Sequence, residues 1–241
     1  CLILPADALS DIYYPYLKEL KELHYQTRDK NSGKPIFRED VAIYQTKEKG
    51  KDFLVTSSVS RGMDGEERKT ISYLTINNNR LSAYAHRIET AKEGIVQQKV
   101  DVDYDWVHHM VQHRISYPKK GKLTVKNIPL DQEFIFSRDT TILFASLLSA
   151  RKNETRLRVM IPTGHIFKVR ALFSYIPEEF MIRGRKYSCF RVELKPDFPL
   201  FSLVAPKMTF WYLSTPPYYF VKYEGPLGGP FSPTVIQELS P

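Results

Sequence analysis

The stretch MTFWYLSTPPYYFVKYEG, residues 208 to 225, decides the fold class. Its two apolar runs are separated by a Thr-Pro-Pro sequence, which is typical of two strands joined by a turn. On the first strand, Phe210 and Tyr212 share one face, and Trp211 and Leu213 share the other. Because a strand at the surface of an antiparallel sheet normally has one polar face, both faces of this strand must be covered. One face packs on a core, and the other either lines a cavity or meets a further buried element.

Most of the remaining chain also shows strand patterns. In residues 94 to 107, Val100, Val102, Tyr104 and Trp106 alternate with aspartates that occupy the opposite face. Roughly ten such segments, separated by glycine, asparagine and proline turns, predict a mainly β protein. We expect a strongly curved antiparallel sheet, as a half-open or closed β-barrel.

Two helices are expected beside these strands. In SRDTTILFASLLSAR, residues 137 to 151, apolar side chains recur at positions 143, 144, 147 and 148, which is helical spacing. The pattern predicts one internal helix near 138 to 150, with Ser137 or Asp139 as its N-terminal cap. Its apolar stripe is broad, so the helix should be well buried. A second, short N-terminal helix is predicted around Pro15 to Leu23.

The first residues suggest export. Residues 1 to 10, CLILPADALS, form an apolar run that is too short to span a bilayer. Three interpretations stay open: Cys1 is the lipid-bearing first residue of a processed bacterial lipoprotein, the run is the remnant of a secretory signal peptide, or the start has no meaning. We favour export to the periplasm of the bacterial cell envelope, with membrane anchoring through Cys1 in the lipoprotein case. Residues 11 to 241 are predicted to form a single β-barrel-like domain.

The composition is that of a globular protein, with 42% hydrophobic and 26% charged residues. The net charge is +8, and basic residues gather in two predicted turns, YPKKGK (117 to 122) and RGRK (183 to 186). Solvated hairpin tips explain such charges by default, and the same charges could contact anionic phospholipid head groups. Nucleic acid is not expected as a partner, because the basic residues are not interleaved with aromatic ones on one surface.

The strongest candidate for chemistry is WVHHMVQHR, residues 106 to 114. His109 and His113 are four residues apart, a spacing that places two metal ligands on one face of a helix. However, Met110 stands where a His-Glu-x-x-His motif has its glutamate, the flanking residues favour a strand, and no third ligand can be named. The chain also lacks a Gly-x-Ser-x-Gly motif. We therefore expect no catalytic residue, no metal and no cofactor, and Cys189 is expected to be a small core thiol.

The order of motifs resembles a family of exported bacterial proteins of unknown function. The matching stretches are an opening hairpin at residues 20 to 47, a helix that starts with Asp at Asp139 to Leu148, and a late Trp-bearing hairpin at Phe210 to Glu224. More distantly, the plan resembles the periplasmic lipoprotein-localisation carriers. Those proteins are half-open β-barrels in which helices cover an apolar concave face. The resemblance implies a half-barrel with an apolar interior.

These observations favour a non-enzymatic cell-envelope protein that binds or carries an apolar ligand, a lipid or an acylated lipoprotein, in the concave face of a half-barrel. The first alternative is a structural or assembly factor of the envelope with a filled barrel, acting through surface contacts. The second is a metal-dependent hydrolase that uses His109 and His113. A large open cavity would favour carriage, and a dense interior would favour the first alternative, because an empty cavity costs stability. The residues expected to line the apolar cavity are Leu143, Phe144, Leu147, Phe173, Phe190, Phe210, Tyr212 and Phe220.

Overall fold

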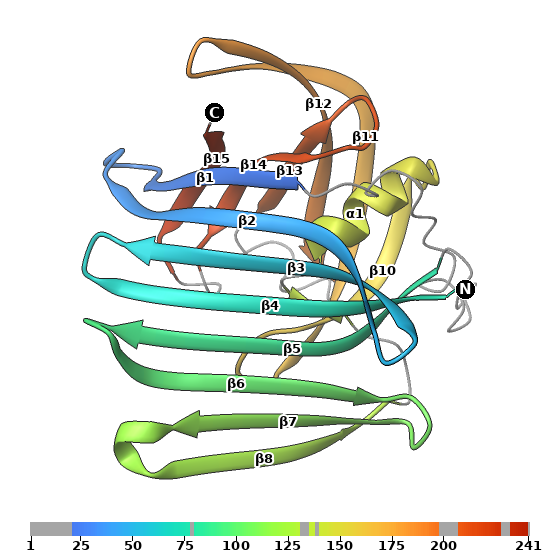
Figure 1. Ribbon diagram of the computed structural model, residues 1–241. Helices are drawn as coiled ribbons and strands as arrows, with labels where there is room; N and C mark the ends of the chain where they lie inside the picture. The colour runs from blue at the N-terminus through green and yellow to red at the C-terminus, as the bar shows by residue number, and fades with distance from the viewer. Residues whose placement is uncertain are drawn as a thin grey trace.

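The computed structural model describes residues 21–77, 80–130, 135–137, 140–197, 207–227 and 232–240. Strands dominate this part of the chain (Figure 1). The elements in chain order are β1 (Lys21–Asp29), β2 (Pro35–Glu48), β3 (Lys51–Gly62), β4 (Glu66–Asn77), β5 (Arg80–Lys92), β6 (Ile95–Asp105), β7 (Met110–Tyr117), η2 (Pro118–Lys120), β8 (Lys122–Pro129), β9 (Ile135–Phe136), α1 (Thr140–Ser149), β10 (Glu154–Met160), β11 (Ile166–Ile182), β12 (Arg185–Pro196), β13 (Met208–Leu213), β14 (Phe220–Pro226) and β15 (Thr234–Ser240).

All of these strands belong to one sheet, in the order β8-β7-β6-β5-β4-β3-β2-β1-β15-β14-β13-β12-β11-β10-β9. Neighbouring strands pair antiparallel, except that β9 pairs parallel with β10. The first and last described strands meet in the middle, where His24 of β1 lies opposite Ser240 of β15. The sheet begins at β8 and ends at β9, so it is open. The prediction of a mainly β, curved antiparallel sheet is confirmed, and its closed-barrel form is wrong.

The sheet curls until its second half crosses behind its first. In Figure 1, β10, β11 and β12 run behind and across the strands from β2 to β6, and α1 lies between the two parts. Met160 of β10 is fully buried in a cluster with Val102 of β6 and Val111 of β7. This contact joins strands that are far apart in the sheet order. The curl therefore creates a concave, apolar interior on one side of the sheet.

The helix α1 fills much of this interior. Leu143, Phe144, Leu147 and Leu148 are all buried in the largest apolar cluster of the described residues. The prediction of one internal helix near 138 to 150 is thus confirmed, although Asp139 lies outside the described residues. The predicted N-terminal helix is not shown. The part of it that the structure describes, Lys21–Leu23, begins strand β1, and residues 15 to 20 lie outside the described ranges.

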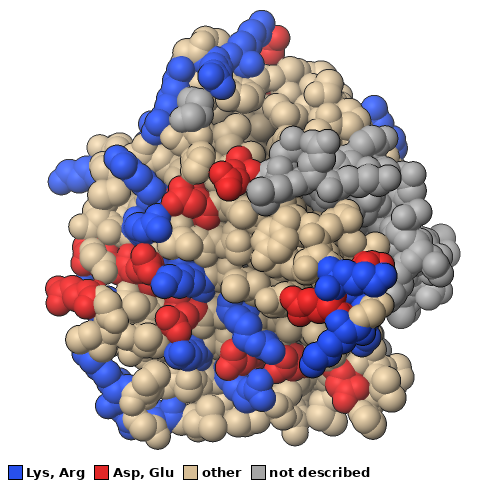
Figure 2. Space-filling model, in the orientation of Figure 1, with Lys and Arg blue, Asp and Glu red and all other residues tan. Residues whose placement is uncertain are grey.

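The outer face of the sheet is polar, and ion pairs join neighbouring strands across it. Arg61 pairs with Asp40 at 2.7 Å and with Glu67 at 3.3 Å, and Arg114 pairs with Asp103 at 2.6 Å. Figure 2 shows the interleaved positive and negative side chains on this face. Exposed pairs of this kind are each worth about 1 kcal/mol or less. Their main effect is that the outer face of the sheet is polar and stays exposed to solvent.

The outer face of β13 is an exception, because it is apolar and buried. It shows what covers the second apolar face that the sequence of this strand predicts. Phe210 and Tyr212 point inward to α1, whereas Trp211 is buried on the opposite face in a small second core with Cys189, Val221 and Ile182. The long β11–β12 hairpin supplies this cover. Its register shifts between Ser174 and Glu178, and beyond that shift the hairpin folds over the outer face. At its tip, the Arg183 side chain donates a hydrogen bond to Gln26 of β1. The second apolar side therefore meets a folded-back hairpin.

A buried histidine in this fold predicts acid sensitivity. His86 is fully buried, bonds to the Ser72 hydroxyl at 2.9 Å and packs edge-on against Tyr104. Burial, with a smaller contribution from the charge of Arg87, lowers the pKa of His86 to about 3. In the unfolded chain, the imidazole of His86 takes up a proton below about pH 6.5, whereas in the fold it stays neutral. The contribution of neutral His86 to stability is therefore fully present above that pH and is lost as the pH falls. We expect the free energy of unfolding to fall by about 1.4 kcal/mol per pH unit between 6.5 and 3 from this group alone.

Urea unfolding at a series of pH values measures this slope. The matched control replaces both polar partners, His86→Phe with Ser72→Ala, so that neither is left unpaired in the core. The double variant should lose the part of the slope above pH 4 that His86 contributes, whereas His113, whose pKa burial also lowers, keeps its own part. An unchanged slope in the double variant would show that another group causes the acid sensitivity.

Candidate functional site

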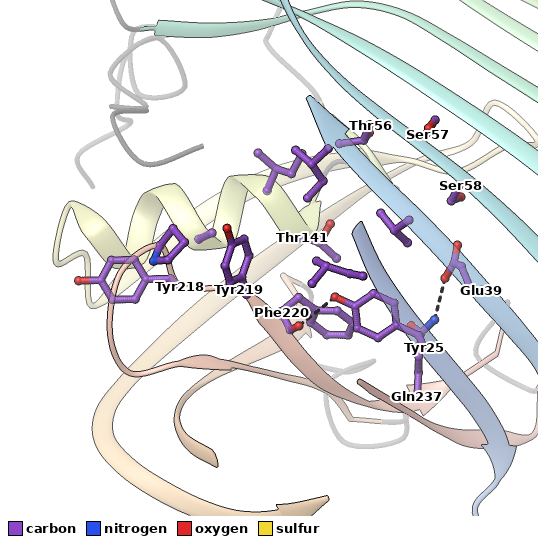
Figure 3. A pocket seen from close by; sticks show the side chains of 16 residues that line it. Tyr25, Glu39, Thr56, Ser57, Ser58, Thr141, Tyr218, Tyr219, Phe220 and Gln237 are labelled. Carbon is purple, nitrogen blue, oxygen red and sulfur yellow. Dashed lines mark hydrogen bonds between the residues drawn. The ribbon is translucent and has the colours of Figure 1, made fainter. Parts of the chain in front are cut away.

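One cavity of about 70 Å³ lies on the concave side, between α1 and the strands β1, β2 and β14 (Figure 3). Its body is apolar. Leu23 and Val41 enter it from the sheet, and Ile142 and Ala145 enter it from the helix. Leu23 and Val41 are only partly buried, although they lie on the concave face of the sheet. The helix therefore leaves part of the apolar concave face uncovered, and this part lines the cavity.

The cavity also has a polar end. Glu39 of β2 is 3% exposed, and its carboxylate accepts a hydrogen bond from the Gln237 amide of β15 at 2.8 Å. Tyr25 lies opposite Glu39 on β1, and its hydroxyl donates to the Phe220 carbonyl at 2.9 Å. Ser58 of β3 is buried beside them. Charged and amide groups thus gather at one end of a mostly apolar space, to which Thr56 and Thr141 add hydroxyl groups, as in many sites for small amphiphilic molecules.

The turn between β13 and β14 forms the remaining wall. Tyr218, at a φ of 54°, donates its backbone N–H to the Thr215 carbonyl at 3.0 Å, which reverses the chain after the two prolines. This turn directs Tyr218, Tyr219 and Phe220 toward α1, as Figure 3 shows. The full lining consists of Leu23, Tyr25, Glu39, Val41, Ile43, Thr56, Ser57, Ser58, Thr141, Ile142, Ala145, Pro217, Tyr218, Tyr219, Phe220 and Gln237.

The eight side chains predicted to line an apolar cavity all join one cluster, but most of them are packed together. Phe144 is fully buried, and its ring centroid lies 5.3 Å from that of Phe210 and 6.1 Å from that of Phe173. Among the eight, Phe220 lines the cavity. The other seven are buried, three of them on α1 and four on the strands that pack against it, namely Leu143, Phe144, Leu147, Phe173, Phe190, Phe210 and Tyr212. The interior at these positions is thus occupied by the helix.

Several lining residues were missed from the sequence. Ile142 lies beside the helical stripe and Val41 lies in an alternating strand, so an apolar pattern was visible at both. Leu23 was assigned to a helix, which hid its place on the concave face. Glu39 and Gln237 had no readable signal, because they meet only across the pairing of β2, β1 and β15.

The two histidines with metal-like spacing do not form a site. His113 lies on β7, is 1% exposed, and donates its Nε2–H to the Pro162 carbonyl at 3.0 Å, which attaches the β10–β11 turn to β7. A Cβ on Gly164 would come within 3.0 Å of the same ring, so glycine is required for this close approach. His109 lies exposed in the β6–β7 turn, at a φ of 49°. Over the described ranges, no group of three His, Cys, Asp or Glu side chains is arranged to hold a metal ion.

Cys189 is a core thiol, as expected. It is fully buried next to Trp211 and Val221, and burial raises the pKa of its thiol to about 12. A thiol in this state is protonated at neutral pH and is a poor nucleophile. The described residues include no helix that is long and apolar enough to cross a membrane.

Comparisons with known proteins give no family and no relative for this chain. No protein-family model, no curated protein and no solved structure matches the chain.

Proposed function

We propose that this protein is a non-enzymatic protein of the bacterial cell envelope that binds an apolar chain, from a lipid or an acylated lipoprotein, in its concave face beside α1. One observation carries the proposal: apolar side chains of β1 and β2 on the concave face are left uncovered by the helix and line a cavity with a polar end. An amphiphile would place its chain against Leu23, Val41 and Ile142. Its head group would lie toward Glu39 and Gln237.

The size of the cavity determines how such a ligand would bind. Its 70 Å³ is less than the roughly 150 Å³ of an apolar cavity that holds benzene, and well below the 300–1,000 Å³ of most ligand pockets. The cavity therefore admits the end of a chain, and a longer chain needs α1 to move outward. The side chains of Leu143, Phe144 and Leu147 pack the helix against the sheet in the large apolar cluster. An acyl chain can replace packing of this kind, because it has no directional requirement.

A matched pair of helix substitutions tests the proposal. Ala145→Leu would fill the cavity, whereas Ala150→Leu adds the same atoms at an exposed position just beyond α1. Binding of a naturally fluorescent fatty-acid ester such as methyl cis-parinarate, whose neutral head adds no negative charge beside Glu39, can be followed by its emission. We expect saturable binding to the unmodified protein and to Ala150→Leu. Ala145→Leu should bind about tenfold or more weakly, corresponding to a loss of at least about 1.4 kcal/mol.

A second candidate function has its own supporting observation. Seven of the eight predicted side chains are packed around α1, which favours a structural or assembly factor with a filled interior. Such a protein would act through its surface. The Tyr218–Tyr219 turn is a poor contact site for this role, because Tyr218 is only 7% exposed and faces the cavity. Equal, non-saturable signals of the fatty-acid ester from all three proteins in the titration would favour this second function over ligand binding.

A further inference from the structure

The edge strand β8 is the strongest feature that ligand binding leaves unexplained. Across the described part of the chain, β8 pairs with β7 along one side, from Met110↔Pro129 to Tyr117↔Lys122, and pairs with no strand along the other. At about 3.3 Å per residue, its eight residues present roughly 26 Å of open edge. Such an edge carries backbone N–H and C=O groups that can pair with another strand.

The side chains of β8 are unusually exposed for a strand with apolar residues. Leu123 is 62% exposed and Val125 is 48% exposed, and both lie on the outer face beside the open edge. By register, Val125 lies opposite Arg114 and Leu123 lies opposite Ser116. An added strand could cover both apolar side chains, which the sheet itself leaves in water.

The charge around this edge has one sign. Residues 106 to 130 contain no Asp or Glu, and they contain Arg114, Lys119, Lys120, Lys122 and Lys126. Arg114 pairs with Asp103 of β6, whereas no ion pair joins any of the four lysines to another described residue. In Figure 2, seen in the orientation of Figure 1, positive side chains gather at the end of the lowest edge, next to the β7–β8 turn.

The positive charges on and beside β8 determine which kind of strand could pair with its open edge. A second copy that paired through its own β8 would bring two sets of lysines together, which like-charge repulsion opposes. A strand with acidic side chains would instead lie next to Lys122 and Lys126 and gain favourable cross-strand contacts. We propose that β8 is a docking edge for an extended, acidic polypeptide segment, which joins the sheet as an added strand next to Lys122 and Lys126.

A synthetic peptide tests this directly. The probe is a fluorescein-labelled peptide of the length of β8 that alternates glutamate with valine or threonine, titrated with the full chain and followed by fluorescence anisotropy. We expect Lys122→Glu with Lys126→Glu to weaken binding about tenfold or more, because both opposite-sign contacts become repulsive. The control is Lys34→Glu with Lys49→Glu, which makes the same charge change at exposed positions beside the two ends of β2, six strands away from β8 in the sheet. The control should bind about as well as the unmodified protein at the same ionic strength after correction for net charge.

A second probe separates strand pairing from simple charge attraction. The same peptide with N-methyl groups on alternate backbone nitrogens keeps its charge but cannot pair along that edge, and it should bind about tenfold more weakly. Equal binding of the methylated peptide would overturn the proposal. Two further outcomes would also overturn it: co-sedimentation with phosphatidylglycerol vesicles but no peptide binding, which assigns the charges to a membrane surface, or a dimer in sedimentation velocity that the β8 charge reversals abolish.

Discussion

Replacing Phe144 by alanine is expected to lower the free energy of unfolding by about 3–5 kcal/mol. Phe144 is fully buried at the centre of the interior, where its ring lies edge-on to those of Phe173, Phe210 and Tyr212. Its removal takes apolar contacts away from the helix and from the two strands β11 and β13 at once. The loss is a large fraction of the roughly 5–15 kcal/mol by which a domain is stable. Urea unfolding followed by circular dichroism measures it.

Phe167→Ala is the matched control for this experiment. Phe167 lies on β11 and is 48% exposed, so the same change should alter the unfolding free energy by only about 0.5 kcal/mol. If Phe144→Ala cost no more than the control, α1 would not be packed into the concave face, and the described interior would be wrong.

Replacing Trp211 by alanine is expected to cost about 3–5 kcal/mol as well, although Trp211 lies on the opposite face of the sheet. The indole packs against Phe180 with ring centroids 5.4 Å apart, and its N–H donates to the Glu178 carboxylate at 2.8 Å. The Lys222 ammonium lies 5.2 Å from the same ring. Loss of the indole removes the centre of the second core, so the outer half of the β11–β12 hairpin should detach from β13 and β14.

Hydrogen exchange of the hairpin amides reports this detachment separately from global unfolding. Trp211→Phe should cost much less, because it keeps an aromatic ring in the second core. In both variants Glu178 loses the indole N–H but keeps its ion pair with Arg191 at 3.0 Å. Unchanged protection of residues 178 to 188 in Trp211→Ala would show that the hairpin does not depend on this core.

Local patterns in the sequence predicted the elements well. Alternation assigned Phe210 and Tyr212 to one face and Trp211 to the other, and the structure places both faces in separate cores. Apolar positions four residues apart predicted α1, and the aspartates of β6 lie outward while Val100 and Val102 are buried. Each of these patterns depends on near neighbours in the chain, where the period of the backbone determines which side chains share a face.

The failures involve contacts between distant parts of the chain. The segment around Leu23 contains good helix formers, but pairing of β1 with both β2 and β15 overrides that preference. The folding of the β11–β12 hairpin over β13 depends on a register shift that no local pattern announces. For the same reason the sequence suggested apolar lining residues but not Glu39 or Gln237, which meet across three strands. Apolar character was predictable, and the position of the cavity was not.

The most direct test of apolar-ligand binding is native mass spectrometry of protein purified gently from its own cells, with organic extraction of the bound material. Comparison of the unmodified protein with Ala145→Leu and Ala150→Leu makes the measurement specific for the cavity beside α1. We predict one apolar molecule per chain on the unmodified protein and on Ala150→Leu, and little or none on Ala145→Leu. An apolar ligand retained equally by all three proteins, or by none of them, would contradict binding at this cavity.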